Sequence, residues 1–462
     1  MVGLALPRTP PHHAAMGHDL TDLLTKLMTR EVGQAGLSGL ARLSGGASME
    51  SWSFDWGNQG YVVRRAPTAD YVADRPYGHD IEAALVSAAH NAGIRAPEVV
   101  AVLADADRLG SGYVMRRVAG DANPAAILAN PPPSLLTDLA RELARIHALP
   151  SAAIPADIPL LDTATALADL KVRFADYGGD RPVIALALKW CQDHLPPPAD
   201  PPVLVHGDYR MGNILVDVDG LSAVLDWELA HRGDAHEDLA YGCMTVWRFA
   251  RPDLPAFGLG TLDDFFAAYV AAGGAPVDRA RFHFWLVYRT TWWALGCLGM
   301  GAAWRAGVDR SLERVVVARR TAEQELDLLM LLEADAPAAE RTCPLPSPVA
   351  TATPAHGEPT AAEIITAVRE WLASDVKAGA QGRDKFMVAV AMNALGIAAR
   401  EVARPITFAD KPLADALLNG SRNLAEPGLL AHLRRQCLDK LTGDMPKYPA
   451  LALARTAWGE DA

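Results

Sequence analysis

The chain is poor in cysteine and carries no excess of basic charge. Its five cysteines, at positions 191, 243, 297, 343 and 437, are odd in number, scattered along the sequence and never in a C-x-x-C pair. This pattern excludes a cysteine-based metal cluster and a disulfide framework, so we expect a reducing, cytoplasmic setting. The formal net charge of −12 argues against a general nucleic-acid binder, although it leaves room for a local basic pocket.

We expect neither an export signal nor a membrane span. Residues 1–16 contain three prolines and two histidines and lack the apolar core of a signal peptide. The most apolar run, residues 282–304, contains His283 and Arg289. Charged and titratable side chains are costly inside a bilayer, so this run predicts a buried helix.

The sequence divides into a long mixed region, a linker and a helical tail. Its 462 residues, half of them hydrophobic, are enough for two or three globular domains. Residues 1–335 mix strand and helix patterns and predict an α+β domain. Six prolines from Pro337 to Pro359 predict a linker over 336–359. Residues 360–462 predict an all-α domain, opened by a capping box at Thr360 and Glu363. Helical patterns fall at 17–35, 135–149, 162–195, 257–272, 281–305, 310–333, 364–374, 385–403 and 427–441.

One segment brings two carboxylates and an amide together. Three short apolar runs predict strands, namely Val203–Val205, Ile214–Val216 and Leu221–Leu225. The loop between the first two runs carries Asp208 and Asn213, and a turn at 217–220 returns the chain so that Asp226 ends beside them. Such a hard, oxygen-rich site suits Mg²⁺. A remaining carboxylate could orient a hydroxyl nucleophile, which is what phosphoryl transfer requires.

The string His206-Gly207-Asp208, then Asn213, then Asp226-Trp227-Glu228 resembles the Brenner motif of aminoglycoside phosphotransferase-like kinases, the APH/choline kinase type. The resemblance implies a two-lobed, protein-kinase-like fold, with an N-lobe over about 36–118 and a C-lobe over about 119–335. It also implies ATP and Mg²⁺ as cofactors, Asp208 as the catalytic base, and Asn213 and Asp226 as the Mg²⁺ ligands.

Downstream, Gly233-Asp234 and Asp238-Leu239-Ala240 resemble a further conserved segment of the same family. Helix capping accounts for Asp234 and Asp238 equally well, so both interpretations stay open.

Upstream residues resemble the family's nucleotide site. Gly45-Gly46, with Ser48 close by, forms a turn whose N–H groups could approach phosphates. Arg64 stands where the family's usual pattern has lysine, and Glu82 on the following helix is its expected partner.

Residues 116–120 resemble the family's hinge, which places Met115 and Val118 beside the adenine. In the helix that follows, we interpret His147 as a packed residue rather than a catalyst.

Residues 281–305 bear on the acceptor. This stretch is basic and aromatic, and aromatics at helical spacing most often belong to a core. An anionic, apolar acyl-CoA would nonetheless favour such a surface, so Arg289 and Trp293 are candidate substrate contacts, together with Trp227 and Glu228.

The C-terminal tail, residues 360–462, resembles a small helical domain found with, or fused to, kinases of hydroxyacyl-CoA thioesters such as 4-hydroxyvaleryl-CoA. This branch implies a phosphotransferase with an alcohol acceptor and an acyl-CoA dehydrogenase-like partner enzyme.

Two alternatives remain. A kinase for an aminoglycoside, a macrolide or a choline-like alcohol would need an acidic acceptor pocket, formed for instance by Glu228, Asp234 and Glu237. A catalytically silent nucleotide-binding scaffold would explain Arg64, but the intact Asp208, Asn213 and Asp226 argue against it.

Overall fold

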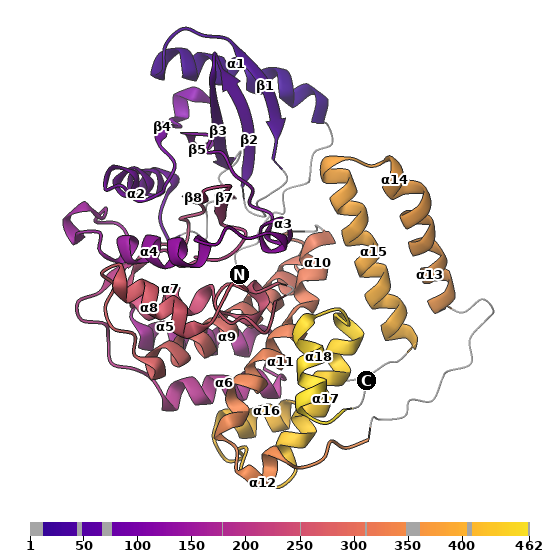
Figure 1. Ribbon diagram of the computed structural model, residues 1–462. Helices are drawn as coiled ribbons and strands as arrows, with labels where there is room; N and C mark the ends of the chain where they lie inside the picture. Colours follow the sequence, from indigo (N-terminus) through magenta and orange to yellow (C-terminus); the bar gives the residue numbers. More distant parts are fainter. Residues whose placement is uncertain are drawn as a thin grey trace, which may run out of the picture. The chain divides into compact units, whose positions relative to one another are not determined.

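A computed structural model describes residues 13–43, 49–66, 76–177, 179–249, 251–309, 312–347, 361–403 and 409–460 (Figure 1). The chain groups into two compact units. The first unit comprises Met1–Asp162, Pro198–Cys243 and Trp247–Phe282, and the second comprises Thr163–Pro197, Met244–Val246 and His283–Ala462. As expected from the sequence, strands and helices mix in the first unit, and the C-terminal region is all-helical.

The first unit begins with helix α1 (His13–Glu31) and contains a five-stranded antiparallel sheet in the order β1-β2-β3-β5-β4. The strands are β1 (Leu37–Arg42), β2 (Glu50–Trp56), β3 (Gln59–Ala66), β4 (Val99–Val102) and β5 (Ser111–Arg116). The leucines of α1, including Leu24 and Leu27, pack on Phe54 and Val63 from the sheet. Their i, i+3 spacing is the periodicity that predicted this helix. Helix α2 (His79–Asn91) lies between β3 and β4 in the chain.

The rest of the first unit supports the predicted loop. Its elements are α3 (Pro124–Ala129), α4 (Leu135–His147), β6 (Val203–Val205), β7 (Ile214–Asp217), β8 (Gly220–Val224), β9 (His231–Gly233), α7 (Ala235–Tyr241) and α8 (Leu262–Ala271). Strand β6 pairs with β9, and β7 pairs with β8 in a hairpin whose turn joins Asp217 to Gly220. Helix α4 buries Leu135, Leu139 and Leu143, which are spaced so that they share one face. The predicted strand, loop and hairpin are therefore confirmed.

The second unit is helical. It contains α5 (Thr163–Tyr177), α6 (Pro182–Asp193), most of α9 (Arg279–Arg305), α10 (Leu312–Arg319), α11 (Thr321–Leu332), α12 (Ala338–Arg341), α13 (Ala361–Trp371), α14 (Lys377–Gly379), α15 (Gly382–Ala403), α16 (Lys411–Leu418), α17 (Leu429–Asp444) and α18 (Pro449–Ala457). The single helix predicted over 310–333 is wrong, because the chain breaks at Arg320 between α10 and α11. The sequence analysis missed the short helices α16 and α18. The domain limits at 335 and 360 stay a prediction. Helices from both sides of these limits belong to one unit, because α16 packs on α6 and α17 packs on α11.

Helix α15 is the one helix in the described part of the chain that is long and apolar enough to cross a membrane. Its most apolar window has a mean hydropathy of 1.5, and 11% of that window is buried. A single helix of this kind is weak evidence, because core helices of soluble proteins meet the same criterion. The run in α9 does not meet it.

Helix α11 carries acidic side chains that are buried in the second unit, and partners from the C-terminal helices bind two of them. Lys440 of α17 forms an ion pair with Glu325, and the hydroxyl of Tyr448 donates to Asp327 at 2.6 Å. Just after α11, Glu333 accepts hydrogen bonds from Arg434 and from the indole of Trp458. A buried carboxylate without donors is costly. The C-terminal helices thus supply donors that α11 and its C-terminal end require.

Replacing Tyr448 with Phe tests this dependence. The Tyr448→Phe variant removes a donor from buried Asp327 and keeps the ring, so the free energy of unfolding should fall by about 1–3 kcal/mol. Tyr177→Phe is the matched control, because Tyr177 lies in the same unit and is 42% exposed. Urea unfolding of both variants would check this, and equal midpoints would contradict the assigned role of Tyr448.

Candidate active site

The loop between β6 and β7 is fixed by a buried carboxylate from another element. Asp238 of α7 accepts the main-chain N–H of His206 at 2.7 Å and that of Gly207 at 2.9 Å. Gly207 has a φ of +81°, and a Cβ there would lie 2.4 Å from the carbonyl oxygen of Leu229, so only glycine fits. Two successive N–H groups are thereby turned toward one side chain, which sets the direction in which the loop continues.

Behind Asp238, His147 links α4 to α8. The two ring nitrogens of His147 lie 3.2 Å from the carboxylate of Asp238 and 2.7 Å from the hydroxyl of Tyr269. His147 therefore supports the loop from behind and does not contact Asp208 in this network. Asp234 has a different role, because it caps α7 by accepting the N–H of His236. Helix capping, one of the two interpretations left open, therefore applies to Asp234. Asp238 does not cap the helix and supports the loop instead.

Asp208 and Asn213 face each other across this loop. Both are largely buried, at 8% and 6% exposed. The side-chain amide of Asn213 donates to the Asp208 carboxylate at 2.5 Å and to its main-chain oxygen at 3.1 Å. The guanidinium of Arg210 donates to the same carboxylate at 2.8 Å and lies 4.2 Å from the ring centroid of Trp247. Asp208 is thus held from two sides.

The charge balance at Asp208 shifts its pKa upward. Burial raises the pKa of this carboxyl, and the nearby charge of Asp226 raises it further, whereas Arg210 lowers it. Sequence reasoning assigned Arg210 no role. Its position two residues after Asp208 in the loop was visible, but the stacking on Trp247 was not.

Asp226 follows β8 and has a φ of +67°, an uncommon conformation for a residue other than glycine. Its carboxylate accepts a hydrogen bond from Arg64 at 2.5 Å. Burial would raise the pKa of Asp226, but the charge and hydrogen bond of Arg64 outweigh burial and lower it. Asp226 is therefore an anion, and the chain holds it there in a strained conformation.

Trp227 corrects one prediction. Its side chain is 1% exposed, its indole donates to the Val224 carbonyl, and its own carbonyl accepts from Tyr77. A side chain in the core cannot line a substrate site, so the proposed contact at Trp227 is wrong. Glu228 lies at the site, where it accepts a hydrogen bond from Arg64 at 2.9 Å.

Arg64 joins the five-stranded sheet to the residues that follow the β7–β8 hairpin, since it donates to both Asp226 and Glu228. Burial opposes its charge, but surrounding acidic groups, with Asp226 first, hold its pKa well above the usual range. Glu82 contributes to that field and is itself fully buried, with a hydrogen bond from Tyr113 at 2.9 Å. Arg64, Glu82 and Tyr113 thus form one charged cluster with the hairpin carboxylates.

The expected hinge is tied to the same hairpin. Met115 pairs with Val62 near the end of β5, and the half-buried Val118 follows just after the strand. Beyond it, the N–H of Asp121 donates to Val216 at 2.8 Å, and the Ser222 hydroxyl donates to Ala119 at 2.7 Å. These contacts fix the hinge edge relative to the loop that carries Asp208.

Not every predicted residue belongs to this cluster. Gly45, Gly46 and Ser48 lie outside the described residues. Arg289 and Trp293 belong to α9 in the second unit, where Arg289 is buried with its guanidinium 4.9 Å from the ring centroid of Trp292. They are therefore described apart from the first-unit site.

The residues present fit a magnesium ion. The amide nitrogen of Asn213 is turned toward Asp208, which leaves the amide oxygen as the atom able to act as a ligand. Asp226 adds a carboxylate, and these hard oxygens suit Mg²⁺, which commonly takes few protein ligands and completes its shell with water and phosphate. Among the described residues there is no group of three or more His, Cys, Asp or Glu that could hold a metal ion.

Asp238 offers a direct test of the loop support. In Asp238→Asn, an amide N–H₂ would face the donors of His206 or Gly207, so the free energy of unfolding should fall by about 2–3 kcal/mol. Exchange of the main-chain amides at 206–213 should also accelerate. Asp107→Asn is the control, because Asp107 is also largely buried, accepts a main-chain N–H and pairs with Arg30 away from the loop. Faster exchange at 206–213 in both variants would refute a specific role for Asp238.

Comparison with known proteins places these residues in a family. Residues 39–285, more than half of the chain, match the family model described as "Phosphotransferase enzyme family". The chain is 28% identical to the mouse protein named acyl-CoA dehydrogenase family member 10 over 283 residues, which covers 54% of this chain and 26% of that protein. It is 28% identical to acyl-CoA dehydrogenase family member 11 of Gallus gallus over 243 residues, which covers 50% and 31%.

The chain thus spans only a quarter to a third of these curated relatives. A solved structure from Ralstonia eutropha, provisionally named an aminoglycoside phosphotransferase, has a similar fold, with a TM-score of 0.54 and 20% identity. The match covers 68% of this chain and 98% of that one. On the matched family model, this chain belongs to the phosphotransferase enzyme family.

Proposed function

We propose that this phosphotransferase transfers the γ-phosphate of Mg·ATP to a hydroxyl group of a hydroxyacyl-CoA. The observation that carries the chemistry is the placement of Asp208 beside Asn213, with the Asp226–Arg64 ion pair close enough for the charge of Asp226 to raise the pKa of Asp208. The acyl-CoA class is supported by relatives that carry the name of acyl-CoA dehydrogenases and contain a segment similar to this chain.

Asp208 would act on the acceptor hydroxyl. The carboxylate orients the hydroxyl oxygen for in-line attack, so that a bond forms from this oxygen to the γ-phosphorus as the bond from that phosphorus to the β-phosphate oxygen breaks. The hydroxyl proton passes to Asp208 and then to solvent, and ADP leaves. Arg210 keeps Asp208 ionised, because its positive charge lowers the pKa that burial raises.

Asn213 and Asp226 would hold Mg²⁺, which supplies charge neutralisation and orientation to the phosphates when it is bound. Arg64 would offer a planar guanidinium to the phosphate oxygens, a geometry that suits phosphate well. In the present structure Arg64 neutralises Asp226 and Glu228 instead. In this cluster Arg64 therefore supplies the carboxylates with the positive charge that Mg²⁺ would supply. The carboxylates supply Arg64 with the negative charge that the phosphates of ATP would supply.

The product would be primed for elimination. Phosphate is a far better leaving group than hydroxide, so a phosphorylated hydroxyacyl chain could lose it in a following step. We propose that an acyl-CoA dehydrogenase-like enzyme carries out that step.

The aminoglycoside or choline alternative loses its predicted pocket. A polycationic or choline-like acceptor would need free acidic contacts, for which the sequence offered Glu228, Asp234 and Glu237. Glu228 is paired with Arg64, Asp234 is paired with Arg281 and caps α7, and Glu237 is buried beside His231. These carboxylates already have cationic or hydrogen-bonding partners, so they do not support a polycationic acceptor.

The first test is Mg²⁺-dependent ADP release with 4-hydroxyvaleryl-CoA, compared with kanamycin and choline. We expect turnover with the CoA thioester alone, and its loss by a factor of about 10³ or more in Asp208→Ala. Asp219→Ala, in the exposed turn of the hairpin, is the control and should keep full activity. Turnover only with kanamycin or choline would refute the acyl-CoA proposal, and equal activity of Asp208→Ala would refute the base.

A second test concerns pH. In Arg210→Met the charge that lowers the pKa of Asp208 is gone, so this pKa should rise and the acid limb of kcat/KM should move to higher pH. Loss of the charged hydrogen bond should also lower kcat/KM at neutral pH by roughly ten- to hundredfold. Arg251→Met, an exposed change in the same unit, should leave the profile in place. An unmoved acid limb in Arg210→Met would show that Asp208 does not govern it.

A further inference from the structure

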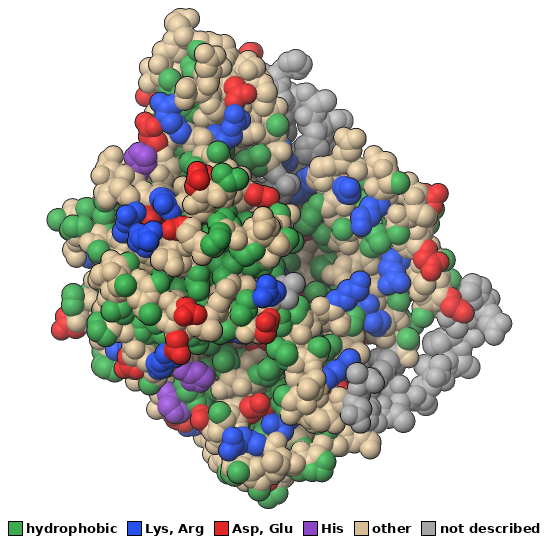
Figure 2. Space-filling model, in the orientation of Figure 1, with side chains coloured by type: hydrophobic (Ala, Val, Ile, Leu, Met, Phe, Trp, Pro, Cys, Tyr) green, Lys and Arg blue, Asp and Glu red, His purple; other side chains and the backbone are tan. Residues whose placement is uncertain are grey.

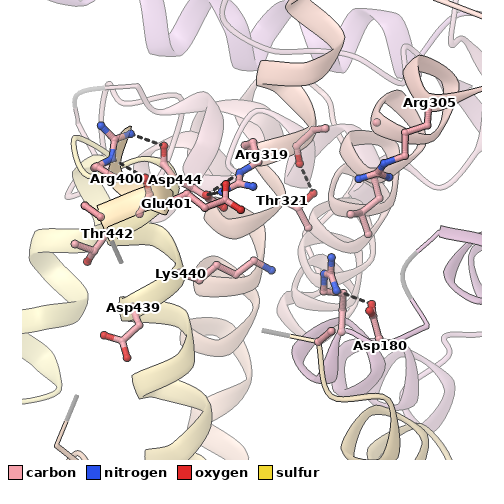
Figure 3. Close-up of a pocket in the computed structure, with 17 residues that line it drawn as sticks. Asp180, Arg305, Arg319, Thr321, Arg400, Glu401, Asp439, Lys440, Thr442 and Asp444 are labelled. Carbon is pink, nitrogen blue, oxygen red and sulfur yellow. Dashed lines mark hydrogen bonds and ion pairs between the residues drawn. The ribbon is translucent and has the colours of Figure 1, made fainter. Parts of the chain in front are cut away.

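A cavity of about 480 Å³ lies wholly within the second unit and takes no part in the site described above (Figure 3). Segments far apart in the sequence line it. They are Asp180–Arg181 before α6, the end of α9, the junction of α10 and α11, the end of α15 and the end of α17. Its size falls in the range of cavities that hold small molecules.

Charged side chains dominate the polar part of the lining. Five are basic and four are acidic, namely Arg181, Arg305, Arg319, Arg400, Lys440, Asp180, Glu401, Asp439 and Asp444. The acidic groups are engaged, because Asp444 and Glu401 both pair with Arg319, Asp180 with Arg181, and Asp439 with Arg435 outside the lining. Lys440 in turn pairs with Glu325.

Arg400 differs from the other cations in this lining. Its guanidinium donates to two main-chain carbonyls, that of Gly443 at 2.6 Å and that of Asp444 at 3.3 Å. Neutral carbonyls hold the group in place without cancelling its charge. Burial lowers the pKa of Arg400, and the positive charges of Arg369 and Arg319 lower it further against the opposing negative charge of Asp444. Such a site has a surplus of positive charge and would be stabilised by an anion.

Local geometry brings these cations together. A Cβ at Gly396 would lie 3.1 Å from a terminal nitrogen of Arg400 and 3.2 Å from one of Arg369, so both guanidinium groups converge over this glycine. Basic side chains also gather over α15 in Figure 2. Arg305 lines the cavity from α9, and Figure 3 shows it on the side opposite Arg400.

The rest of the lining is mostly apolar, with Leu298, Gly301, Ala318, Ala403 and Ala409, and it also includes Gly443 and the hydroxyl side chains of Thr321 and Thr442. An occupant that fits both parts of the wall combines an oxyanion with a compact apolar group. We propose that this cavity binds a small organic anion, a phosphate ester or a carboxylate, that is attracted by the positive charges of Arg400 and Arg305 on its two sides. This site is independent of the proposed kinase reaction.

Titration calorimetry on the full chain tests the proposal with three matched probes, phenyl phosphate, benzoate and benzyl alcohol. A non-hydrolysable ATP analogue with Mg²⁺ at saturation keeps the probes out of the nucleotide site. We expect one of the two anions to bind with a Kd below about 1 mM, and the uncharged alcohol not to saturate. Which anion binds distinguishes a phosphate ester from a carboxylate.

Variants assign the site. Arg400→Gln and Arg305→Gln should each weaken anion binding by about tenfold or more. Arg383→Gln is the matched control, because Arg383 lies on the same helix α15, pairs with Glu313 and does not line the cavity. If Arg400→Gln fails to fold, Arg305→Gln still decides, since its side chain is exposed at the rim. The proposal is overturned if neither anion saturates, if the alcohol binds equally well, or if both cavity variants bind as the wild type does.

Discussion

The carboxylate of Asp238 is the contact on which the loop between β6 and β7 depends. It accepts two consecutive main-chain N–H groups, from His206 and Gly207, and so fixes the turn that presents Asp208. Helices α4 and α8 hold this carboxylate in place through His147 and Tyr269. A charge buried this deeply is stable only while all its donors remain, which makes the loop rigid and ties its geometry to the surrounding core.

Opposite charges are matched in pairs throughout the first-unit site. Asp208 faces Arg210 of its own loop, and Asp226 faces Arg64 of β3, so each of these two anions has a cation beside it. Such a site does not have to create charge when a nucleotide and a cation enter. It exchanges internal partners for external ones, which lowers the desolvation cost of binding a highly charged ligand.

Local patterns in the sequence were sufficient for the strands, the loop and the positions of Asp208, Asn213 and Asp226, because these lie within a short span of chain. The failures at the site share one cause, which is contact between distant residues. Trp227, whose indole is buried in the core, directly follows Asp226, whose φ is positive. The sequence does not show this backbone conformation. Trp247 contacts Arg210 from a separate segment of the chain. Asp238 of α7 accepts hydrogen bonds from the loop, which precedes it in the sequence. The helices α16 and α18 were too short for their periodicity to be recognised.

The buried acids of α11 also constrain the order in which the chain can mature. Residues of the first unit end at 282, whereas Glu325, Asp327 and Glu333 find donors at positions 434–458. During synthesis, the ribosome must therefore release more than a hundred further residues before α11 can bury those side chains with their partners. The first unit can reach its native contacts before these later residues are made, and the second unit becomes complete only once Trp458 has been synthesised.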